Sequence, residues 1–301
     1  MTALTLAIAD RSFSSWSLRG WLLCGLTGAP FRVRFAEMRS AEFTALQAAF
    51  APALTVPMLE IGEGEGRAQV WESLAIAETL AEMFPAAGLW PEDRAARAAA
   101  RSLAAEMHAG FGDLRRACPM ALERRWSGFE APEGALRDAA RIEALWAWAR
   151  GRFGAGGPWL FGARYGAADA FFAPVATRFV TYGLPMSGVS AAYVAAHYAD
   201  PAFRRWRAMG VAEGRGETRP DLPLAQAPRF GPEPIPALAL VGAEAAAAAP
   251  VNAACPYSGK PWERESLAEI GGRTVGFCNP FCRDKSVADA AAWPALAPLL
   301  G

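Results

Sequence analysis

The order of strand and helix signals in the first 85 residues constrains the fold more than any other feature of the sequence. Short apolar or alternating runs, typical of strands, are separated by longer runs whose apolar residues recur at helical spacing. Glycine and proline residues end several of these runs. The third and fourth strands flank the turn GEGEG, so we expect an antiparallel hairpin there. The expected order is strand, helix, strand, helix, strand, strand and helix, at residues 4–9, 15–27, 31–35, 41–50, 57–61, 67–71 and 73–84.

The next part of the chain, up to about residue 210, carries helix signals and no convincing strand. The composition then shifts, because residues 214–250 hold seven prolines and an alanine run, which predicts a linker with little structure of its own. After the linker, a compact segment is expected to hold a strand at 274–278 and a short helix after Pro280. The helices expected before the linker span residues 91–126, 132–153, 167–182 and 190–209.

These signals divide the chain into four segments: an α/β domain at 1–85, an all-α domain at 90–212, a linker at 213–250 and a small cysteine-containing module at 251–301. The balance of 30 basic and 30 acidic residues favours neither nucleic acid nor an anionic membrane as a partner. No run is long and apolar enough to predict a membrane span, and the N-terminus lacks the features of a secretion signal. We therefore expect a cytoplasmic protein whose five cysteines are thiols or metal ligands.

Two serines lie where the first strand passes into the first helix. Ser14 and Ser15, within SFSSWSLRGWL, place hydroxyl groups beside the free N–H groups and positive dipole end of that helix. A hydroxyl in this position can donate a hydrogen bond to a sulfur anion. Lowering a thiol pKa of ~8.5 by about two units requires roughly 2.7 kcal/mol, which one charge-assisted hydrogen bond and a helix end can supply. The alternative is that the serines only cap the helix.

Two further features of the first domain suit a peptide-like ligand. Val56 precedes Pro57 at the start of the third strand, and a cis bond there would turn the Val56 backbone toward an extended ligand. Glu72 and Ser73 open the last helix, where a hydroxyl and backbone N–H groups suit a carboxylate and the Glu72 carboxylate suits an ammonium. The alternatives are an ordinary strand-start proline and an ordinary helix cap.

Together these features resemble the glutathione S-transferase family over residues 3–210. SSWSLR is similar to the serine motif of zeta-class and related bacterial transferases, in which SSCSWR is typical. The resemblance implies a thioredoxin-like α/β domain followed by an all-α domain, a cytoplasmic homodimer, and glutathione as co-substrate. It assigns thiol activation to Ser14 with Ser15 beside it, contacts with the cysteinyl backbone to Val56 next to Pro57, and γ-glutamyl contacts to Glu72 and Ser73.

The sequence departs from that family in three places. Trp16 replaces the cysteine of the zeta motif, which argues against assuming the zeta isomerase reaction. Leu54 and Thr55 replace the Gly-Lys pair often found before Val-Pro. Gly166 replaces the usual Ser/Thr helix cap, while Asp169 matches the capping acid and is expected to be structural.

The first helix expected in the all-α domain offers candidates for binding the second substrate. His108, Phe111 and Arg115 recur at i, i+3 and i+7 on the expected helix at 91–126. In a transferase this helix lines the pocket of the electrophile, so we interpret Phe111 as an apolar wall and His108 or Arg115 as groups that steady negative charge. The alternatives are core packing for Phe111 and a surface or interfacial ion pair for Arg115.

Three cysteines gather near the C-terminus, in CPYSGKP and CNPFC. This segment resembles the YHS/TRASH-type metal-binding modules. Thiolates from Cys255, Cys278 and Cys282 suit zinc or another soft metal ion, although structural zinc normally has four ligands. The fourth ligand would be water, Asp284 or a group that the sequence does not identify. A redox-active Cys278–Cys282 pair and inert thiols are the alternatives.

The sequence thus predicts a glutathione transferase, or a glutathione-dependent isomerase, that acts on an electrophilic small molecule and carries an appended metal-binding module. The rival prediction is a non-catalytic, dimeric transferase-like scaffold or metal-binding adaptor. A glutathione-dependent disulfide reductase is disfavoured, because it would prefer a cysteine near Ser14 and the nearest is Cys24.

Overall fold

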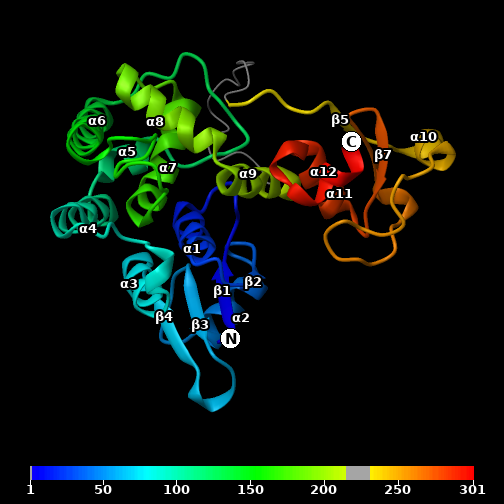
Figure 1. The fold of residues 1–301 in the computed structure, drawn as a ribbon, viewed down its shortest axis with the longest axis horizontal. Helices are drawn as coiled ribbons and strands as arrows, with labels where there is room; N and C mark the ends of the chain where they lie inside the picture. Colours follow the sequence, from blue (N-terminus) through cyan, green and yellow to red (C-terminus); the bar gives the residue numbers. More distant parts are fainter. Residues whose placement is uncertain (1, 215–230) are drawn as a thin grey trace. The chain divides into compact units, whose positions relative to one another are not determined.

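The computed structural model describes residues 2–214 and 231–301 of the chain (Figure 1). Internal contacts divide the described residues into two compact units. The first holds residues up to His197, and the second holds 198–214 and 231–301. Residues 215–230 of the predicted linker lie outside the described residues. In the described part of the chain no helix combines the length and apolar character needed to cross a bilayer.

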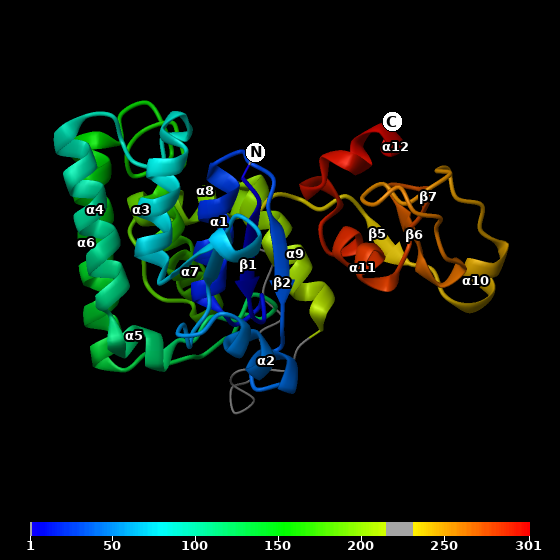
Figure 2. The same ribbon diagram turned by 90° about the horizontal axis from the view of Figure 1, so that it is seen from below.

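The first unit begins with a four-stranded sheet in the order β2-β1-β3-β4 (Figure 1). Figure 2 shows β1 and β2 of this sheet side by side. Strand β1 pairs in parallel with β2 and antiparallel with β3, and β3 and β4 form the expected hairpin. Alternate side chains of β1 reach opposite faces: Ala7 packs against α2, and Leu6 faces α1. The elements are β1 (Leu4–Ile8), α1 (Ser15–Leu26), β2 (Arg32–Phe35), α2 (Ala41–Ala49), β3 (Met58–Ile61), β4 (Ala68–Trp71) and α3 (Ser73–Met83).

Helix α1 approaches β3 closely because one of its residues is a glycine. A Cβ placed on Gly20 would lie 2.6 Å from the Cβ of Pro57, well inside contact distance. The absent side chain thus lets α1 lie directly against the start of β3. The Val56–Pro57 peptide bond is cis, as the sequence suggested.

The rest of the first unit is helical, with α7 at its centre. All sixteen residues of α7 are buried, and the helix packs against both α1 and α4. The fold is therefore a thioredoxin-like α/β domain followed by helices, as predicted. The helices are α4 (Arg94–Ala109), α5 (Gly112–Ala117), α6 (Glu133–Phe153), α7 (Ala167–Tyr182) and α8 (Gly188–Ala199), whose last two residues belong to the second unit.

The prediction of one continuous helix over 91–126 is wrong. Helix α4 ends at Ala109, and Phe111 adopts a left-handed backbone conformation (φ 63°) that precedes α5. Helix α5 ends at Ala117, because Cys118 precedes Pro119 and a residue before proline disfavours the helical conformation. The helical face that the sequence pattern gave to His108, Phe111 and Arg115 is consequently not formed by a single helix.

The second unit contains a three-stranded antiparallel sheet in the order β5-β6-β7. Helix α9 belongs to this unit and packs on α11, where Arg204 donates two hydrogen bonds to the buried carboxylate of Asp289 (2.6 and 2.9 Å). The elements are α9 (Pro201–Glu213), β5 (Ala237–Ala239), α10 (Gly242–Ala247), β6 (Leu267–Ile270), β7 (Arg273–Gly276), α11 (Pro280–Ala288) and α12 (Ala297–Leu300).

The expectation of little structure over 213–250 is wrong for its C-terminal part. Strand β5 lies there and forms one edge of the sheet, and α10 follows it. Strand β6 also escaped the prediction, whereas the strand expected near residue 274 and the helix after Asn279 are present. Short strands gain most of their stability from pairing across the sheet, which a local pattern does not record.

Candidate functional site

The two predicted catalytic serines differ in their hydrogen bonds. Ser14 caps α1: its hydroxyl oxygen accepts from the Ser17 N–H (3.2 Å), and its proton is donated to the Ser17 hydroxyl (2.8 Å). Ser17 in turn accepts from the N–H of Ala9 (3.0 Å), which ties the helix start to β1. Ser15 is the first residue of α1, and its hydroxyl makes no hydrogen bond to the described residues. Of the two hydroxyls, that of Ser15 is therefore the one with its proton uncommitted.

The backbone of Val56 lies just before the start of β3, and its polar groups are not used in the sheet. Neither its N–H nor its carbonyl bonds the backbone of another described residue. An extended ligand can pair with such groups as a neighbouring strand would. Pro57 is buried against Gly20 of α1. This contact holds the segment that precedes β3 against the middle of α1.

The start of α3 brings Glu72 and Ser73 next to a residue of the helical part. The imidazole Nε2 of His108 lies 3.4 Å from the Glu72 carboxylate, and Nδ1 lies 3.5 Å from the Ser73 hydroxyl. Glu72 has a positive φ of 68°, a strained conformation for a non-glycine residue, and its side chain is 52% exposed. Ser73 is fully buried. The predicted γ-glutamyl pair and the predicted pocket residue His108 thus form one group.

Burial lowers the pKa of His108, and the charges of Arg19 and Arg115 lower it further, while Glu72 opposes them. A neutral imidazole at neutral pH follows from this balance. The neutral ring can accept from the Ser73 hydroxyl at Nδ1 and direct its Nε2 proton toward Glu72. His108 can therefore hold both side chains of the pair in place.

Trp16 joins these residues to two arginines. The Arg19 and Arg115 guanidinium groups lie 4.5 and 4.9 Å from its ring centroid, and the His108 ring meets it edge-on at 5.1 Å. Arg115 donates to the carbonyl oxygens of Met107 and His108, so it closes the turn between α4 and α5. The predicted residues Arg115 and His108 are thus brought together at Trp16.

The structure separates Phe111 from this group. Phe111 is buried in the turn between α4 and α5, and in the described residues its ring meets neither Trp16 nor His108. Conversely, sequence reasoning gave no role to Arg19 and treated Trp16 only as a departure from a motif. The available signal was the four-residue spacing from Ser15 to Arg19, which places both on one face of α1.

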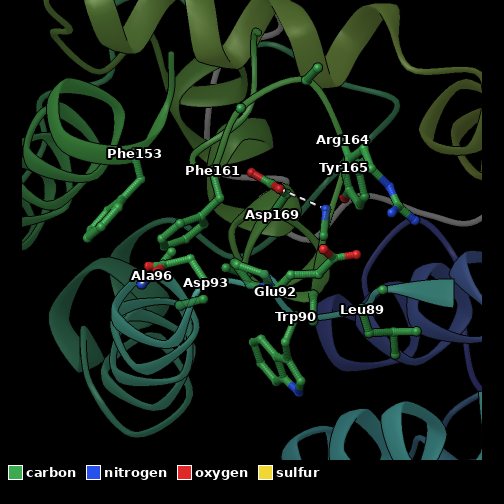
Figure 3. A pocket seen from close by; sticks show the side chains of 18 of the residues that line it. Leu89, Trp90, Glu92, Asp93, Ala96, Phe153, Phe161, Arg164, Tyr165 and Asp169 are labelled. Atoms are coloured by element: carbon green, nitrogen blue, oxygen red, sulfur yellow. Dashed lines mark hydrogen bonds between the residues drawn. The ribbon is translucent and has the colours of Figure 1, made fainter. Parts of the chain in front are cut away.

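A cavity lies elsewhere in the first unit. It has a volume of about 620 Å³ and is lined by aromatic residues that include Trp90, Phe153 and Phe161 (Figure 3). None of the predicted site residues lines it. Asp169 lies at its edge and accepts from the N–H of Gly166 (2.9 Å), the N–H of Leu160 (3.1 Å) and the Tyr193 hydroxyl (2.8 Å). These bonds agree with the structural role expected for Asp169.

The three C-terminal cysteines are brought together in the second unit. Their sulfur atoms all lie within 4.8 Å of one another. Burial opposes ionisation of Cys255, but the neighbouring N–H groups of Cys278, Tyr257 and Ser258 and the Ser258 hydroxyl favour its thiolate, and its pKa is lowered to about 7. The Ser258 hydroxyl donates to the Cys278 sulfur (3.2 Å). Burial and the other two thiols raise the pKa of Cys282 to about 12, against the charge of Lys285. The carboxylate of Asp284 pairs with Arg283 at 2.7 Å.

Comparison with known families gives one match. Residues 13–83 match the family described as "Glutathione S-transferase, N-terminal domain". This part of the chain contains Ser14, Ser15, Val56, Glu72 and Ser73, so sequence and fold agree on the class of domain that holds them. Comparison with curated proteins gives no match.

Solved structures similar to this chain are glutathione transferases and related proteins. A glutathione transferase homolog from Burkholderia GL BGR1, with bound glutathione, is 23% identical with a TM-score of 0.52 over 69% of this chain and 98% of that one. Glutathione transferase Omega 2S from Trametes versicolor is 19% identical with a TM-score of 0.52 over 71% and 96% of the two chains. Maleylacetoacetate isomerase from Anaeromyxobacter dehalogenans 2CP-1, with glutathione in its active site, is 26% identical with a TM-score of 0.51 over 68% and 94%.

Proposed function

We propose that the protein is a glutathione-dependent transferase or isomerase. The observation that carries this proposal is the uncommitted Ser15 hydroxyl at the start of α1, within a domain that matches the glutathione S-transferase N-terminal family. The free Val56 backbone and the Glu72–Ser73 pair supply the remaining contacts that an extended tripeptide needs. The glutathione-bound structures similar to this chain support the same ligand. The homodimer and the cytoplasmic location stay predictions.

In this proposal the chain binds glutathione along the start of β3. The ammonium group meets the Glu72 carboxylate, and the γ-glutamyl carboxylate meets the N–H groups at the start of α3. The cysteinyl backbone pairs with Val56 next to Pro57. The thiol then lies at the start of α1, where the helix dipole and a serine hydroxyl favour the thiolate. The thiolate attacks an electrophilic carbon of a small molecule, and proximity supplies the rest of the acceleration.

The resemblance assigns thiol activation to Ser14, whereas the hydrogen bonds favour Ser15. The proton of the Ser14 hydroxyl is donated to Ser17, so Ser14 would have to abandon its capping geometry to donate to sulfur. Ser15 needs no such rearrangement. We therefore propose Ser15 as the donor to the thiolate and Ser14 as the cap that positions it.

Matched substitutions test this assignment. Ser15→Ala should raise the thiol pKa of bound glutathione, which is measured by the ultraviolet absorbance of the thiolate. It should also lower turnover by about tenfold or more, with little change in stability. Ser14→Ala should lower the unfolding free energy by about 1 kcal/mol through loss of the cap. Unchanged thiol pKa and turnover in both variants would refute the serine mechanism. Failure of the wild-type protein to bind immobilised glutathione would favour the non-catalytic scaffold.

The reaction type is open to a direct comparison. The similarity to a maleylacetoacetate isomerase, together with Trp16 in place of the zeta cysteine, leaves both conjugation and isomerisation as candidates. Conjugation consumes glutathione in equal amount to product, whereas isomerisation regenerates it. Measuring free thiol during turnover of an aryl halide and of a cis-configured unsaturated acid distinguishes the two.

We also propose that Cys255, Cys278 and Cys282 bind zinc or another soft metal ion. Three sulfurs bound to one zinc at ~2.3 Å would lie about 3.8 Å apart, so the 4.8 Å limit on their present separation requires only small side-chain movements. The depressed pKa of Cys255 and the elevated pKa of Cys282 fit a cluster that a cation would hold together. The metal would tie the loop before β6 to the start of α11 and so stabilise a small core.

Elemental analysis of the purified full chain tests this second proposal. About one equivalent of metal is expected, and Cys282→Ala should abolish retention of the metal and lower the melting temperature. Cys24→Ala is the matched control, because Cys24 is also a buried thiol but lies in α1 of the first unit. Metal-free wild-type protein after purification and zinc challenge would refute the site.

A further inference from the structure

Arg19 is a buried cation with no hydrogen-bond or ion-pair partner among the described residues. Arg19 lies at the middle of α1 and is 1% exposed. Its Nε and Nη1 atoms are buried and make no hydrogen bond to the described residues. Nη2 likewise makes no hydrogen bond to the described residues. The only close partners of the guanidinium are two aromatic rings in the described chain, Trp16 at 4.5 Å and Phe171 at 5.1 Å.

A second buried arginine shows what a satisfied environment looks like. Arg178 of α7 is 4% exposed, yet its Nε donates to the carbonyl oxygen of Cys118 (2.8 Å) and its Nη1 to that of Pro174 (3.0 Å). Arginine cannot escape burial by losing its proton at physiological pH. An unpaired buried guanidinium is therefore among the most unfavourable groups a protein can retain, and its presence calls for an anion.

The surroundings of Arg19 add positive rather than negative charge. The charged groups that act on it are Arg115 and Arg178, and both disfavour its own charge. Among the described residues no carboxylate lies within ion-pairing distance of it. Glu72 pairs with His108 instead, and Asp138 acts on Arg115. The cluster around Trp16 therefore holds a positive charge, that of Arg19, with which no carboxylate of the described residues pairs.

We propose that Arg19 is an anion-binding residue of this site, acting beside the Ser15 hydroxyl one helical turn away on α1. This inference rests on the proposed function for the location of the site, and it adds that the site binds a negatively charged group. The ligand is a singly charged anionic group held next to Trp16. Two sources offer that chemistry: the thiolate of bound glutathione, and a carboxylate on the second substrate.

The first arm of the test is stability. If the charge of Arg19 serves a ligand, Arg19→Met removes an unpaired buried cation and should leave the melting temperature of the free protein equal or higher. Arg178→Met is the matched control, and it should lower the melting temperature because it strands two carbonyl oxygens. A loss in Arg19→Met as large as that in Arg178→Met would make the charge of Arg19 structural and would overturn the proposal.

The second arm identifies the anion. If the ligand is the thiolate, Arg19→Met should raise the pKa of bound glutathione while acetate affects wild type and variant alike. If the ligand is a carboxylate, acetate at constant ionic strength should raise the melting temperature of the wild-type protein only. The affinity of Arg19→Met for acetate should be lower than that of wild type by about tenfold or more. Arg19→Lys, which keeps a charge without the planar fork, should retain part of either effect.

Equal behaviour of wild type and Arg19→Met in both measurements would overturn the proposal. The acetate measurement needs no glutathione, so it tests Arg19 even if the wild-type protein fails to bind glutathione. That failure would refute the proposed function while leaving the anion site to be judged on acetate alone.

Discussion

Two groups of buried polar side chains lie in the first unit, one at the start of α7 and one around Trp16. At α7, Asp169 accepts three hydrogen bonds from Gly166, Leu160 and Tyr193. Around Trp16, Arg19 makes no hydrogen bond to the described residues, and the Ser15 hydroxyl has no partner among them. The carboxylate of Asp169 is thus satisfied within the fold, whereas the second group holds a charged donor, Arg19, without a hydrogen-bond partner among the described residues. A buried charge without such a partner distinguishes the candidate site from the structural role of Asp169.

The largest effect is expected for Asp169→Ala. The substitution leaves two N–H groups and one hydroxyl buried without an acceptor, which should cost about 3 kcal/mol or more of unfolding free energy. Urea unfolding measures this loss. Asp169→Asn, which keeps one acceptor oxygen, should lose less. Equal stability of Asp169→Ala and wild type would show that this group is not structural.

His197 is the exception within the satisfied group, and it gives the next largest effect. Both ring nitrogens are buried without a hydrogen-bond partner in the part of the chain that the structure describes, and burial lowers the pKa of His197 to about 3. The unfolded chain, with a histidine pKa of ~6.5, binds more protons, so stability falls as pH drops below that value. His197→Leu removes this penalty. Its unfolding free energy relative to wild type should improve by about 2 kcal/mol between pH 8 and pH 5; a constant difference would contradict the assignment.

In the unsatisfied group, loss of a polar atom should affect ligand binding more than stability. Glu72→Gln removes the carboxylate proposed to hold the ammonium of glutathione, and its side chain is half exposed. We expect binding of glutathione to weaken by about tenfold, with unfolding free energy changed by less than about 0.5 kcal/mol. Calorimetric titration and urea unfolding measure the two. The reverse pattern would place Glu72 with the structural group.

The smallest effect is a change in one pKa. Arg19 and Arg115 both lower the pKa of His108, so Arg19→Met should raise it. The chain has 2 histidines, and His197 stays neutral throughout the range in which His108 titrates. Proton NMR therefore follows His108 as the single titrating imidazole. If the pKa of His108 does not rise in Arg19→Met, the charge of Arg19 does not act on His108 as the structure indicates.

Local pattern sufficed for the parts of this fold that local chemistry determines. The element order up to Met83 follows from alternation and breakers. The cis bond before Pro57 and the capping role of Asp169 were expected from the family resemblance, and both are present. The turn at Phe111 was missed, because a phenylalanine with positive φ contradicts local preference and is retained through tertiary packing.

The candidate site was harder to predict than the fold. The serines were predicted, but the Ser14 hydroxyl is hydrogen-bonded and the Ser15 hydroxyl is not because of the position of Ser17. The difference between Arg19 and Arg178 depends on which carbonyl oxygens α5 and α7 leave within reach, and nothing in the residues beside them encodes it. The proximity of Cys255 to Cys278 and Cys282 was expected, whereas strand β5 of the same unit was not.

The contact between Gly20 and Pro57 has a consequence for how this site can vary. Ser15 and Arg19 belong to the same helix as Gly20, and Val56 belongs to the same segment as Pro57. One methyl group at position 20 would force the helix and the strand apart, and with them the groups proposed to meet the sulfur and those proposed to meet the peptide backbone. The alignment of those two sets of groups therefore depends on a glycine to which the proposed mechanism gives no chemical role.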